Sequence, residues 1–131
     1  MCGIVAYAGI KPTNLFGDVF DSYGAQSTRG TKGYGMAIVY PDYSVQVVRA
    51  VSEAGIVTRS MELFSKGKRS HRAILFHHRF PTSTENTIGT THPFFISHES
   101  LDFDYLIIHN GVISNDTELH AQHLKDGFKY K

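Results

Sequence analysis

Residues 1–10 read MCGIVAYAGI, and this apolar stretch forms the first element of the fold. Its hydrophobic run predicts a short buried strand over residues 3–8, bounded by Gly9 and the Lys11-Pro12 pair. No basic leader precedes the stretch, and it is far shorter than the roughly 20 residues that cross a bilayer. Myristoylation requires Gly directly after Met, a place that Cys2 holds. We therefore expect a buried strand, no targeting segment and no membrane contact.

Length and composition are typical of one globular domain. The 131 residues are 41% hydrophobic and 19% charged, and a chain of this length buries about two-thirds of its unfolded surface in a single core. Thirteen Lys and Arg against twelve Asp and Glu give a formal charge of +1, so no excess of basic charge favours nucleic acid. The single cysteine excludes an intrachain disulfide. We expect one cytoplasmic domain over residues 1–131 without a nucleic-acid partner.

Hydrophobic periodicity predicts both strands and helices along the rest of the chain. Two strands flank the turn signal Pro41-Asp42, and the polar segment over residues 82–91 predicts a mobile loop that covers a site. Because strands and helices are segregated rather than regularly alternating, we expect an α+β sandwich. The predicted strands are residues 33–40, 44–51, 73–80 and 104–109; the predicted helices are residues 13–26, 58–66 and 114–125, with Val57, Met61 and Phe64 on the apolar face of the second helix and Gly67 after it.

Cys2 carries the most chemical information, because removal of the initiator Met would make it the first residue. Aminopeptidases remove that Met when the second side chain is small. An N-terminal cysteine has a thiol beside a free amine of reference pKa about 7.7–8.0, so the amine acts as a base near neutral pH. The thiol can then attack a carbonyl while the amine handles its proton through one water. Cys2 is our candidate nucleophile, and a small buried hydrophobic residue is the alternative interpretation.

Three further clusters lie where predicted strands or the polar loop end. Arg79 stands at the end of an apolar strand, and its guanidinium suits bidentate binding of a substrate carboxylate. His92 closes the loop, where its ring can orient the loop or a substrate. Asn110 and Gly111 together offer a side-chain amide and a backbone N–H, the two donors of an oxyanion hole. Their structural alternatives are a surface ion pair, a buried structural histidine and an Asn-Gly turn.

The chain resembles the class II glutamine amidotransferase domain, an N-terminal-nucleophile glutaminase, in the order and approximate spacing of its motifs. These motifs are Met1-Cys2-Gly3-Ile4-Val5, Arg29-Gly30 with Gly35, His77-x-Arg79-x-x-Thr82, His92-Pro93 and His109-Asn110-Gly111-x-Ile113-x-Asn115. The resemblance extends from Cys2 to Phe128. It implies an N-terminal-nucleophile αββα sandwich of two antiparallel sheets between helix layers, incomplete at the C-terminal end of these residues.

The resemblance also implies a reaction and a role for each matching residue. The thiol would attack the side-chain amide of L-glutamine, release ammonia and form a γ-glutamyl thioester that water hydrolyses. No metal or other cofactor is implied. By the resemblance, Cys2 would be the nucleophile and its amine the general base, while Asn110 and Gly111 would form the oxyanion hole. Arg79 would bind the glutamine α-carboxylate. Thr82 and His92 would shape the pocket and lid, and Arg29 would support the loop of the nucleophile.

The sequence departs from the family pattern in three places. Lys32 stands where relatives commonly have an acidic residue, and Ser83-Thr84 replaces a glycine after the loop threonine. Relatives also continue into a Thr-Asp segment whose carboxylate binds the glutamine α-amino group, and the 131 residues end before such a segment. We expect glutamine binding by these residues to be weak or absent, and we expect the ammonia acceptor on another domain or subunit. The alternative function is a catalytically inactive, truncated domain that acts as a binding or structural module.

Two other interpretations compete with the glutaminase. Eight histidines, among them His120 and His123 at helical spacing, raise the possibility of a catalytic zinc site, although no HExxH motif occurs. An amide hydrolase of the same superfamily with another substrate is the second interpretation. Arg79 favours a substrate with a free carboxylate but says little more about it.

Overall fold

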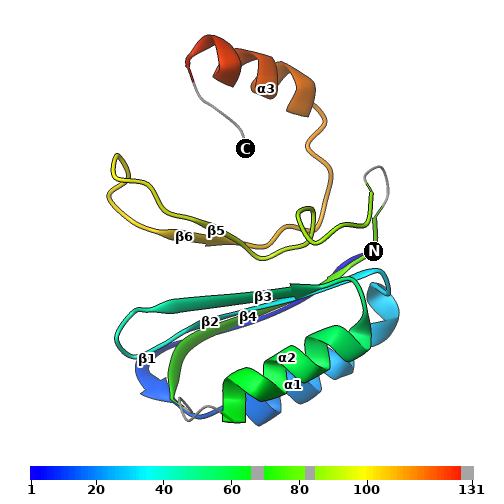
Figure 1. Ribbon diagram of the computed structural model, residues 1–131, viewed down its shortest axis with the longest axis vertical. Coiled ribbons are helices and arrows are strands. Elements are labelled where there is room, and N and C mark those ends of the chain that lie inside the picture. The colour runs from blue at the N-terminus through cyan, green and yellow to red at the C-terminus, as the bar shows by residue number, and fades with distance from the viewer. Residues whose placement is uncertain (66–69, 82–84, 128–131) are drawn as a thin grey trace.

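The computed structural model describes residues 1–65, 70–81 and 85–127, which form an α+β fold (Figure 1). This coarse fold class was predicted from the sequence. The strands are β1 (Gly3–Thr13), β2 (Gly33–Val39), β3 (Val45–Ala50), β4 (His71–Arg79), β5 (Phe94–Ile96) and β6 (Tyr105–Ile107); the helices are α1 (Phe16–Gly24), α2 (Glu53–Ser65) and α3 (Asp116–Lys125), with a 3-10 turn, η1 (Ser27–Arg29).

Four strands form an antiparallel sheet in the order β1-β4-β2-β3, and β5 and β6 form a separate antiparallel pair. In the larger sheet, Gly3 of β1 pairs with His78 and Gly33 of β2 pairs with Arg79. The starts of β1 and β2 therefore both lie beside the end of β4. This register brings the N-terminal segment next to the polar residues that end the apolar β4 run.

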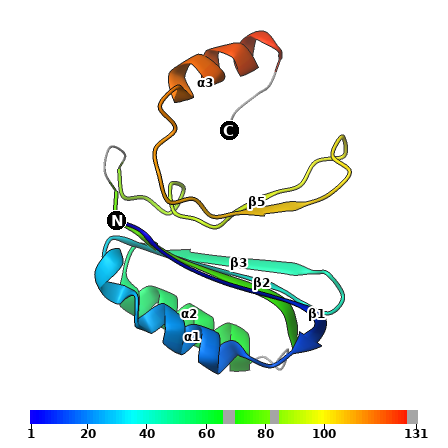
Figure 2. The ribbon, with the colours of Figure 1, turned by 180° about the vertical axis from the view of Figure 1, so that it is seen from behind.

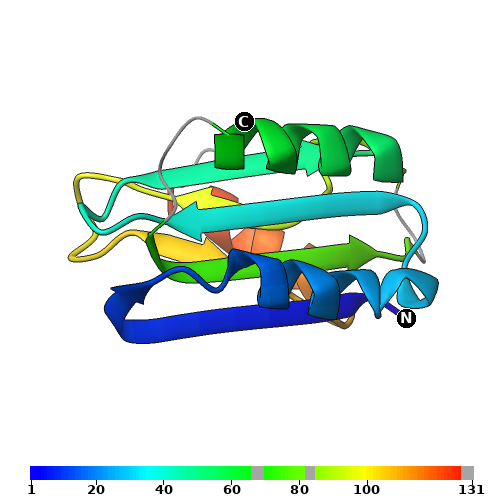
Figure 3. The ribbon, with the colours of Figure 1, turned by 90° about the horizontal axis from the view of Figure 1, so that it is seen from below.

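The elements are stacked in layers, as two opposite views show (Figures 1 and 2). Helices α1 and α2 cover one face of the larger sheet, the β5-β6 pair lies over the other face, and α3 lies beyond that pair. Helix α1 packs on β1 and β4, whereas α2 packs on β2 and β3 (Figure 3). In the described part of the chain, no helix is long and apolar enough to cross a membrane.

The main core lies between the two helices and the larger sheet. Side chains on a strand alternate between its faces, and Ile74 and Phe76 of β4 are fully buried in this core. The Phe76 ring stacks on Tyr23 of α1 with a centroid distance of 4.4 Å and lies 6.2 Å from Phe16. Aromatic pairs of this kind add about 0.5–1.5 kcal/mol to the stabilisation from burial. The core therefore holds β4 rigidly at the centre of the sheet.

The opposite face of β2 is built from small residues so that a loop can approach it closely. A Cβ on Gly35 would overlap the backbone carbonyl oxygen of His92, and a Cβ on Gly33 would come within 2.9 Å of Thr91 Oγ1. Thr91 is fully buried at this contact. The two glycines therefore position the segment that leads from the polar loop into β5.

The first strand and helix differ from the prediction. Strand β1 continues to Thr13 through Lys11 and Pro12, with an irregularity in its pairing between Ala8 and Thr13. Proline is tolerated there because β1 is an edge strand, whose outer backbone groups need no partner in the sheet. Helix α1 consequently begins at Phe16 rather than at residue 13.

The second predicted helix starts too late and has the wrong buried face. Helix α2 begins at Glu53, and Ile56 and Ser60 are fully buried while Val57 and Met61 are 40% and 58% exposed. Sheet contacts along β2 and β3 select this face, and local periodicity alone could not identify it. The predicted contribution of the Phe64 side chain and the predicted stop at Gly67 lie outside the described residues.

The C-terminal half agrees with the prediction in outline. Helix α3 ends at Lys125 as predicted, and Gly127 has φ +89°, a conformation that favours glycine after a helix. Strand β6 covers only the centre of the predicted 104–109 strand, and its partner β5 was not predicted. A strand of three residues carries too little periodicity to be recognised from sequence.

Candidate functional site

The thiol of Cys2 lies at the end of β4. Phe80 follows β4, and its backbone N–H donates a hydrogen bond to Cys2 Sγ across 3.4 Å. The Sγ in turn lies 3.9 Å from the Phe80 carbonyl oxygen, within reach of an S–H donor. Both contacts follow from the antiparallel pairing of β1 with β4, which places Cys2 one step beyond the Gly3–His78 pair. The thiol of the nucleophile candidate thus contacts backbone atoms of Phe80 and not its side chain.

The backbone carbonyl of Cys2 is held from two sides. Arg29 at the end of η1 donates from Nε across 3.4 Å, and Asn110 after β6 donates from Nδ2 across 3.2 Å. Two segments far apart in the sequence therefore converge on the residue that carries the thiol. Arg29 and Asn110 thus both contact the backbone of Cys2, and the supporting role that the resemblance implies for Arg29 stays a prediction.

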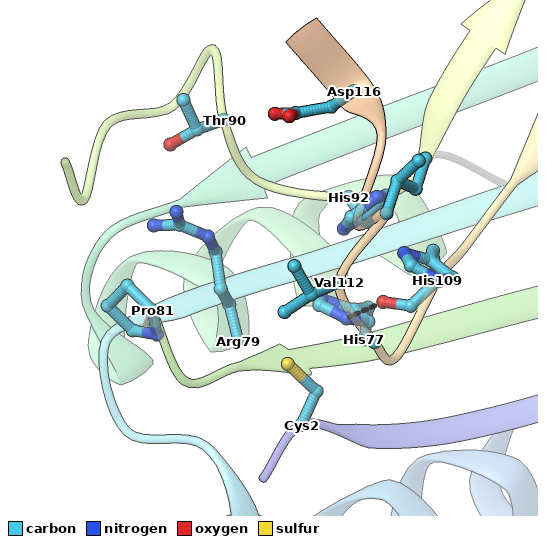
Figure 4. Close-up of a pocket in the computed structure, with 11 residues that line it drawn as sticks. Cys2, His77, Arg79, Pro81, Thr90, His92, His109, Val112 and Asp116 are labelled. Atoms are coloured by element: carbon cyan, nitrogen blue, oxygen red, sulfur yellow. Dashed lines mark hydrogen bonds between the residues drawn. The ribbon is translucent and has the colours of Figure 1, made fainter. Parts of the chain in front are cut away.

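A pocket of about 260 Å³ opens beside the thiol (Figure 4). Its wall combines a thiol, rings, one cation, one carboxylate and apolar side chains, so it can recognise a small polar molecule by several kinds of contact. The lining residues are Cys2, His77, Arg79, Pro81, Thr90, His92, His109, Gly111, Val112, Ile113 and Asp116.

Arg79 supplies the positive charge of the pocket. The residue is only 6% exposed, and its Nη1 donates to the Glu85 backbone oxygen and to Asn86 Oδ1, each across 3.1 Å. The Asn86 amide in turn donates to the Lys32 backbone oxygen. These contacts fix the guanidinium on the loop. A preorganised cation of this kind loses little side-chain entropy when it binds an anion.

The loop that carries these contacts is organised by hydrogen bonds of its own. Thr90 Oγ1 donates to the Glu85 backbone oxygen across 2.8 Å, and Thr91 Oγ1 donates to the Thr87 backbone oxygen across 2.8 Å. Thr90 thereby becomes part of the pocket wall. The movement that we predicted for the 82–91 segment stays a prediction, and residues 82–84 lie outside the described residues.

A histidine pair forms the floor of the pocket. The rings of His77 and His92 lie 4.7 Å apart edge to face, and His77 Nε2 donates to the His109 backbone oxygen across 3.2 Å. Burial and the neighbouring His92 lower the pKa of His77 to about 4, and burial and His109 lower the pKa of His92. Both rings are therefore neutral near pH 7. Arg79, rather than either of these two histidines, carries positive charge in the pocket.

Another histidine, His78, is buried on the opposite face of the sheet, where it contacts α1. Its ring stacks on Tyr23 at 3.8 Å, and its Nε2 donates to the Tyr23 backbone oxygen across 2.8 Å. Burial lowers the pKa of His78 and raises the pKa of Tyr23. A Cβ on Gly30 would lie 2.7 Å from the His78 carbonyl carbon, so the turn that carries Arg29 sits directly on β4.

The structure brings most of the predicted site residues together. Cys2, Arg79, His92 and Gly111 line the pocket, while Arg29 and Asn110 contact the Cys2 backbone instead. Thr82 lies outside the described residues.

Sequence analysis missed several lining residues, of which Asp116 is the most important because it is the acidic one. Asp116 is the first residue of α3, and the helix-capping pattern around Asn115 drew attention to local structure only. His109 stood within a quoted motif and Thr90 within the predicted polar loop, yet nothing in the sequence indicated that these two residues line the pocket.

The zinc interpretation receives no support from the described residues, which contain no group of three or more His, Cys, Asp or Glu side chains arranged to hold a metal ion. His120 and His123 lie on α3 and do not line the pocket, whereas His77 and His92 do. A comparison of the chain with protein-family models and with curated proteins found no match.

Proposed function

We propose that this chain is a glutaminase domain of the class II amidotransferase type, which hydrolyses the side-chain amide of L-glutamine to glutamate and ammonia. The observation that carries the proposal is the position of the Cys2 thiol in one small pocket with the buried Arg79 cation and with Gly111. A nucleophile, an anchor for a carboxylate and a backbone donor are the groups that such a reaction requires.

In the proposed reaction, Cys2 acts after removal of Met1, which is 79% exposed and therefore accessible to an aminopeptidase. Arg79 binds the substrate α-carboxylate and so directs the amide end toward the thiol. The amine of Cys2 takes the thiol proton as sulfur attacks the amide carbon. Gly111 N–H, and the Asn110 amide if it turns from the Cys2 carbonyl, stabilise the oxyanion.

Collapse of the tetrahedral intermediate breaks the C–N bond, and the protonated amine gives its proton to the leaving nitrogen. Ammonia departs and a γ-glutamyl thioester remains on Cys2. Water then attacks the thioester, its proton passes to the amine, and glutamate leaves as the thiol is restored. The ammonia acceptor belongs, in this proposal, to a synthase domain or subunit other than these residues.

The layer order supports the finer fold assignment within this proposal, an N-terminal-nucleophile αββα sandwich. The first layer is formed by helices α1 and α2, and the second by the four-stranded antiparallel sheet. The β5-β6 pair forms the third layer, and α3 lies beyond it (Figures 1 and 2). The second sheet has only two strands of three residues. An incomplete outer layer is what the resemblance implies for this portion of such a domain.

The test is release of glutamate and ammonia from L-glutamine by purified protein whose intact mass shows that Met1 is absent. We expect release by the wild type, release at background level by Cys2→Ala, and a raised KM for Arg79→Lys, because Lys lacks the bidentate geometry. Equal, background-level release by the wild type and Cys2→Ala would contradict the proposal. Retention of Met1 in active protein would contradict the role of the amine.

One observation favours a second candidate, a binding module without catalysis. The Asn110 amide donates to the Cys2 carbonyl rather than lining the pocket, so the pocket wall holds one of the two proposed oxyanion donors, Gly111. A binding module would bind glutamine by calorimetry equally well as wild type and as Cys2→Ala, and the wild type would release no glutamate.

A further inference from the structure

The segment over residues 109–111 contains both oxyanion donors of the proposed reaction. It follows β6, lies outside the helices and strands, and is exposed. Two hydrogen bonds connect it to the region of β1 and β4. His77 Nε2 donates to the His109 carbonyl oxygen, and Asn110 Nδ2 donates to the Cys2 carbonyl oxygen, each across 3.2 Å. Figure 4 marks the bond between His77 and His109 on the wall of the pocket.

His77 is the rigid end of its bond to this segment. It lies on β4, where its backbone pairs with Ile4 of β1 and with Gly35 of β2. Its side chain is 0% exposed, and the ring packs edge to face on His92. A buried ring on a strand that is paired on both sides has already lost its conformational freedom, so it can hold an exposed segment at little further cost in entropy.

We propose that His77 is a positioning residue, which fixes the His109 carbonyl and through it the backbone N–H of Gly111 beside the Cys2 thiol. This inference rests on the proposed function, in which Gly111 stabilises the oxyanion. His77 acts through the 109–111 segment and takes no proton in the reaction.

His109 and Asn110 transmit the constraint to Gly111. A Cβ on Gly111 would lie 3.0 Å from His109 Nε2, so the His109 ring folds over Gly111. The Gly111 N–H belongs to the peptide group that follows Asn110, and the peptide group before Asn110 is the one that His77 holds. If the Asn110 amide leaves the Cys2 carbonyl to reach the oxyanion, the bond from His77 still holds the segment.

The bond also selects one tautomer of the His77 ring. A carbonyl oxygen only accepts, so Nε2 of the neutral ring carries the proton and Nδ1 carries none. Within the described residues, the buried Nδ1 has no hydrogen-bond partner. An unsatisfied buried nitrogen costs free energy. Packing alone therefore does not explain a histidine here, whereas a task for its Nε2–H does.

Four variants separate this hydrogen bond from the volume of the ring. In His77→Gln the amide nitrogen lies about where Nε2 lies and can donate to His109, whereas the shorter His77→Asn cannot reach it. His77→Phe keeps a ring and removes the donor. His78→Phe is the matched control, because His78 is also buried on β4 and donates to a backbone oxygen, that of Tyr23, but does not line the pocket.

The experiment measures glutamate release and the backbone amide resonance of Gly111 in nitrogen–proton correlation spectra, at a temperature where urea denaturation shows each form to be folded. We expect His77→Phe and His77→Asn to lower kcat by about 10- to 100-fold with little change in KM, because misplacing a group by about 1 Å costs up to 100-fold. Both should shift the Gly111 resonance. His77→Gln should restore the resonance and most of kcat, and His78→Phe should leave both near the wild type.

The outcomes distinguish this inference from the proposed function. A kcat of His77→Phe equal to that of the wild type or of His78→Phe overturns the positioning role and leaves the glutaminase intact. Equal losses in His77→Gln and His77→Asn do the same, and this pair alone carries the test if His77→Phe does not fold. If the wild type releases no glutamate, a Gly111 shift that only His77→Gln reverses supports the positioning role and overturns the glutaminase. An unmoved resonance in that case overturns both.

Discussion

The side-chain amide of Asn110 donates a hydrogen bond to the backbone carbonyl oxygen of Cys2, across 3.2 Å and more than a hundred residues of sequence. This contact ties the segment after β6 to the residue that directly precedes β1. It also gives Asn110 two separable tasks in the proposed reaction, which are anchoring of Cys2 and donation to the oxyanion.

Substitution of Asn110 by Asp or Ala distinguishes these tasks. If the amide turns to the oxyanion during acylation, its loss should lower kcat by about 100- to 1,000-fold, the usual effect of removing one such donor, with little change in KM. The measurement is steady-state glutamate release. A loss of only a few-fold in both variants would leave Asn110 as an anchor of the nucleophile alone.

A methyl group on Gly35 should destabilise the protein and disturb His92. The added Cβ would overlap the His92 carbonyl oxygen and lie 2.7 Å from its carbonyl carbon. Because backbone atoms cannot move aside easily, we expect Gly35→Ala to lower the free energy of unfolding by about 1–3 kcal/mol in urea denaturation. Gly17→Ala on α1, where no atom lies within 4 Å of the added Cβ, is the control. It should raise stability by about 0.5–1 kcal/mol, and equal effects would contradict the argument.

Two serines of the α2 region should respond in opposite directions to replacement by Ala. Ser52 Oγ accepts from the Gly55 backbone N–H across 3.2 Å and caps the helix, so Ser52→Ala should cost about 1 kcal/mol. Ser60 is fully buried, and within the described ranges its hydroxyl has no hydrogen-bond partner. Ser60→Ala should therefore raise stability by about 1 kcal/mol, because it removes an unsatisfied polar group and improves helix propensity. Two shifts of the same sign in thermal denaturation would refute this account of α2.

The start of α2 also illustrates the limits of sequence analysis for the fold. The sequence predicted the bounds of β2, β3 and β4 to within a residue or two. The turn signal at Pro41 separates the first two, and a strand that is buried on both faces, such as β4, is a continuous hydrophobic run in the sequence. Ser52 is a cap signal of the same local kind, but Gly55 in the first turn obscured the start of the helix, and Val57 and Met61 indicated the wrong buried face.

The candidate site, like the fold, could be predicted from the sequence only in part. Cys2, Arg79, His92 and Gly111 could be proposed from residue type and order, and the pairing of β1 with β4 brings the first two together. Asp116 could not be proposed, because its place in the pocket depends on the path of the chain between β6 and α3. No local pattern encodes that path, which follows from the packing of the whole outer layer.

The buried histidines predict how stability changes in acid. Unfolded histidines bind a proton near pH 6.5, whereas burial and the neighbouring His92 lower the pKa of folded His77 to about 4. Burial lowers the pKa of His78 and His92 as well. Between these pH values the unfolded chain therefore binds more protons than the folded one, and acid favours unfolding.

We expect the free energy of unfolding to be highest above about pH 6.5 and to fall steadily toward pH 4. For His77 alone, a pKa lowered from 6.5 to about 4 corresponds to a loss on the order of 3 kcal/mol. Urea denaturation across this range provides the measurement. His77→Gln keeps an N–H donor for the His109 carbonyl and should make the free energy of unfolding less dependent on pH. Ser60→Ala should change the free energy of unfolding by the same amount at every pH and leave its pH dependence unchanged. Wild-type stability that stays constant between pH 4 and 6.5 would show that these rings are not held neutral by the fold.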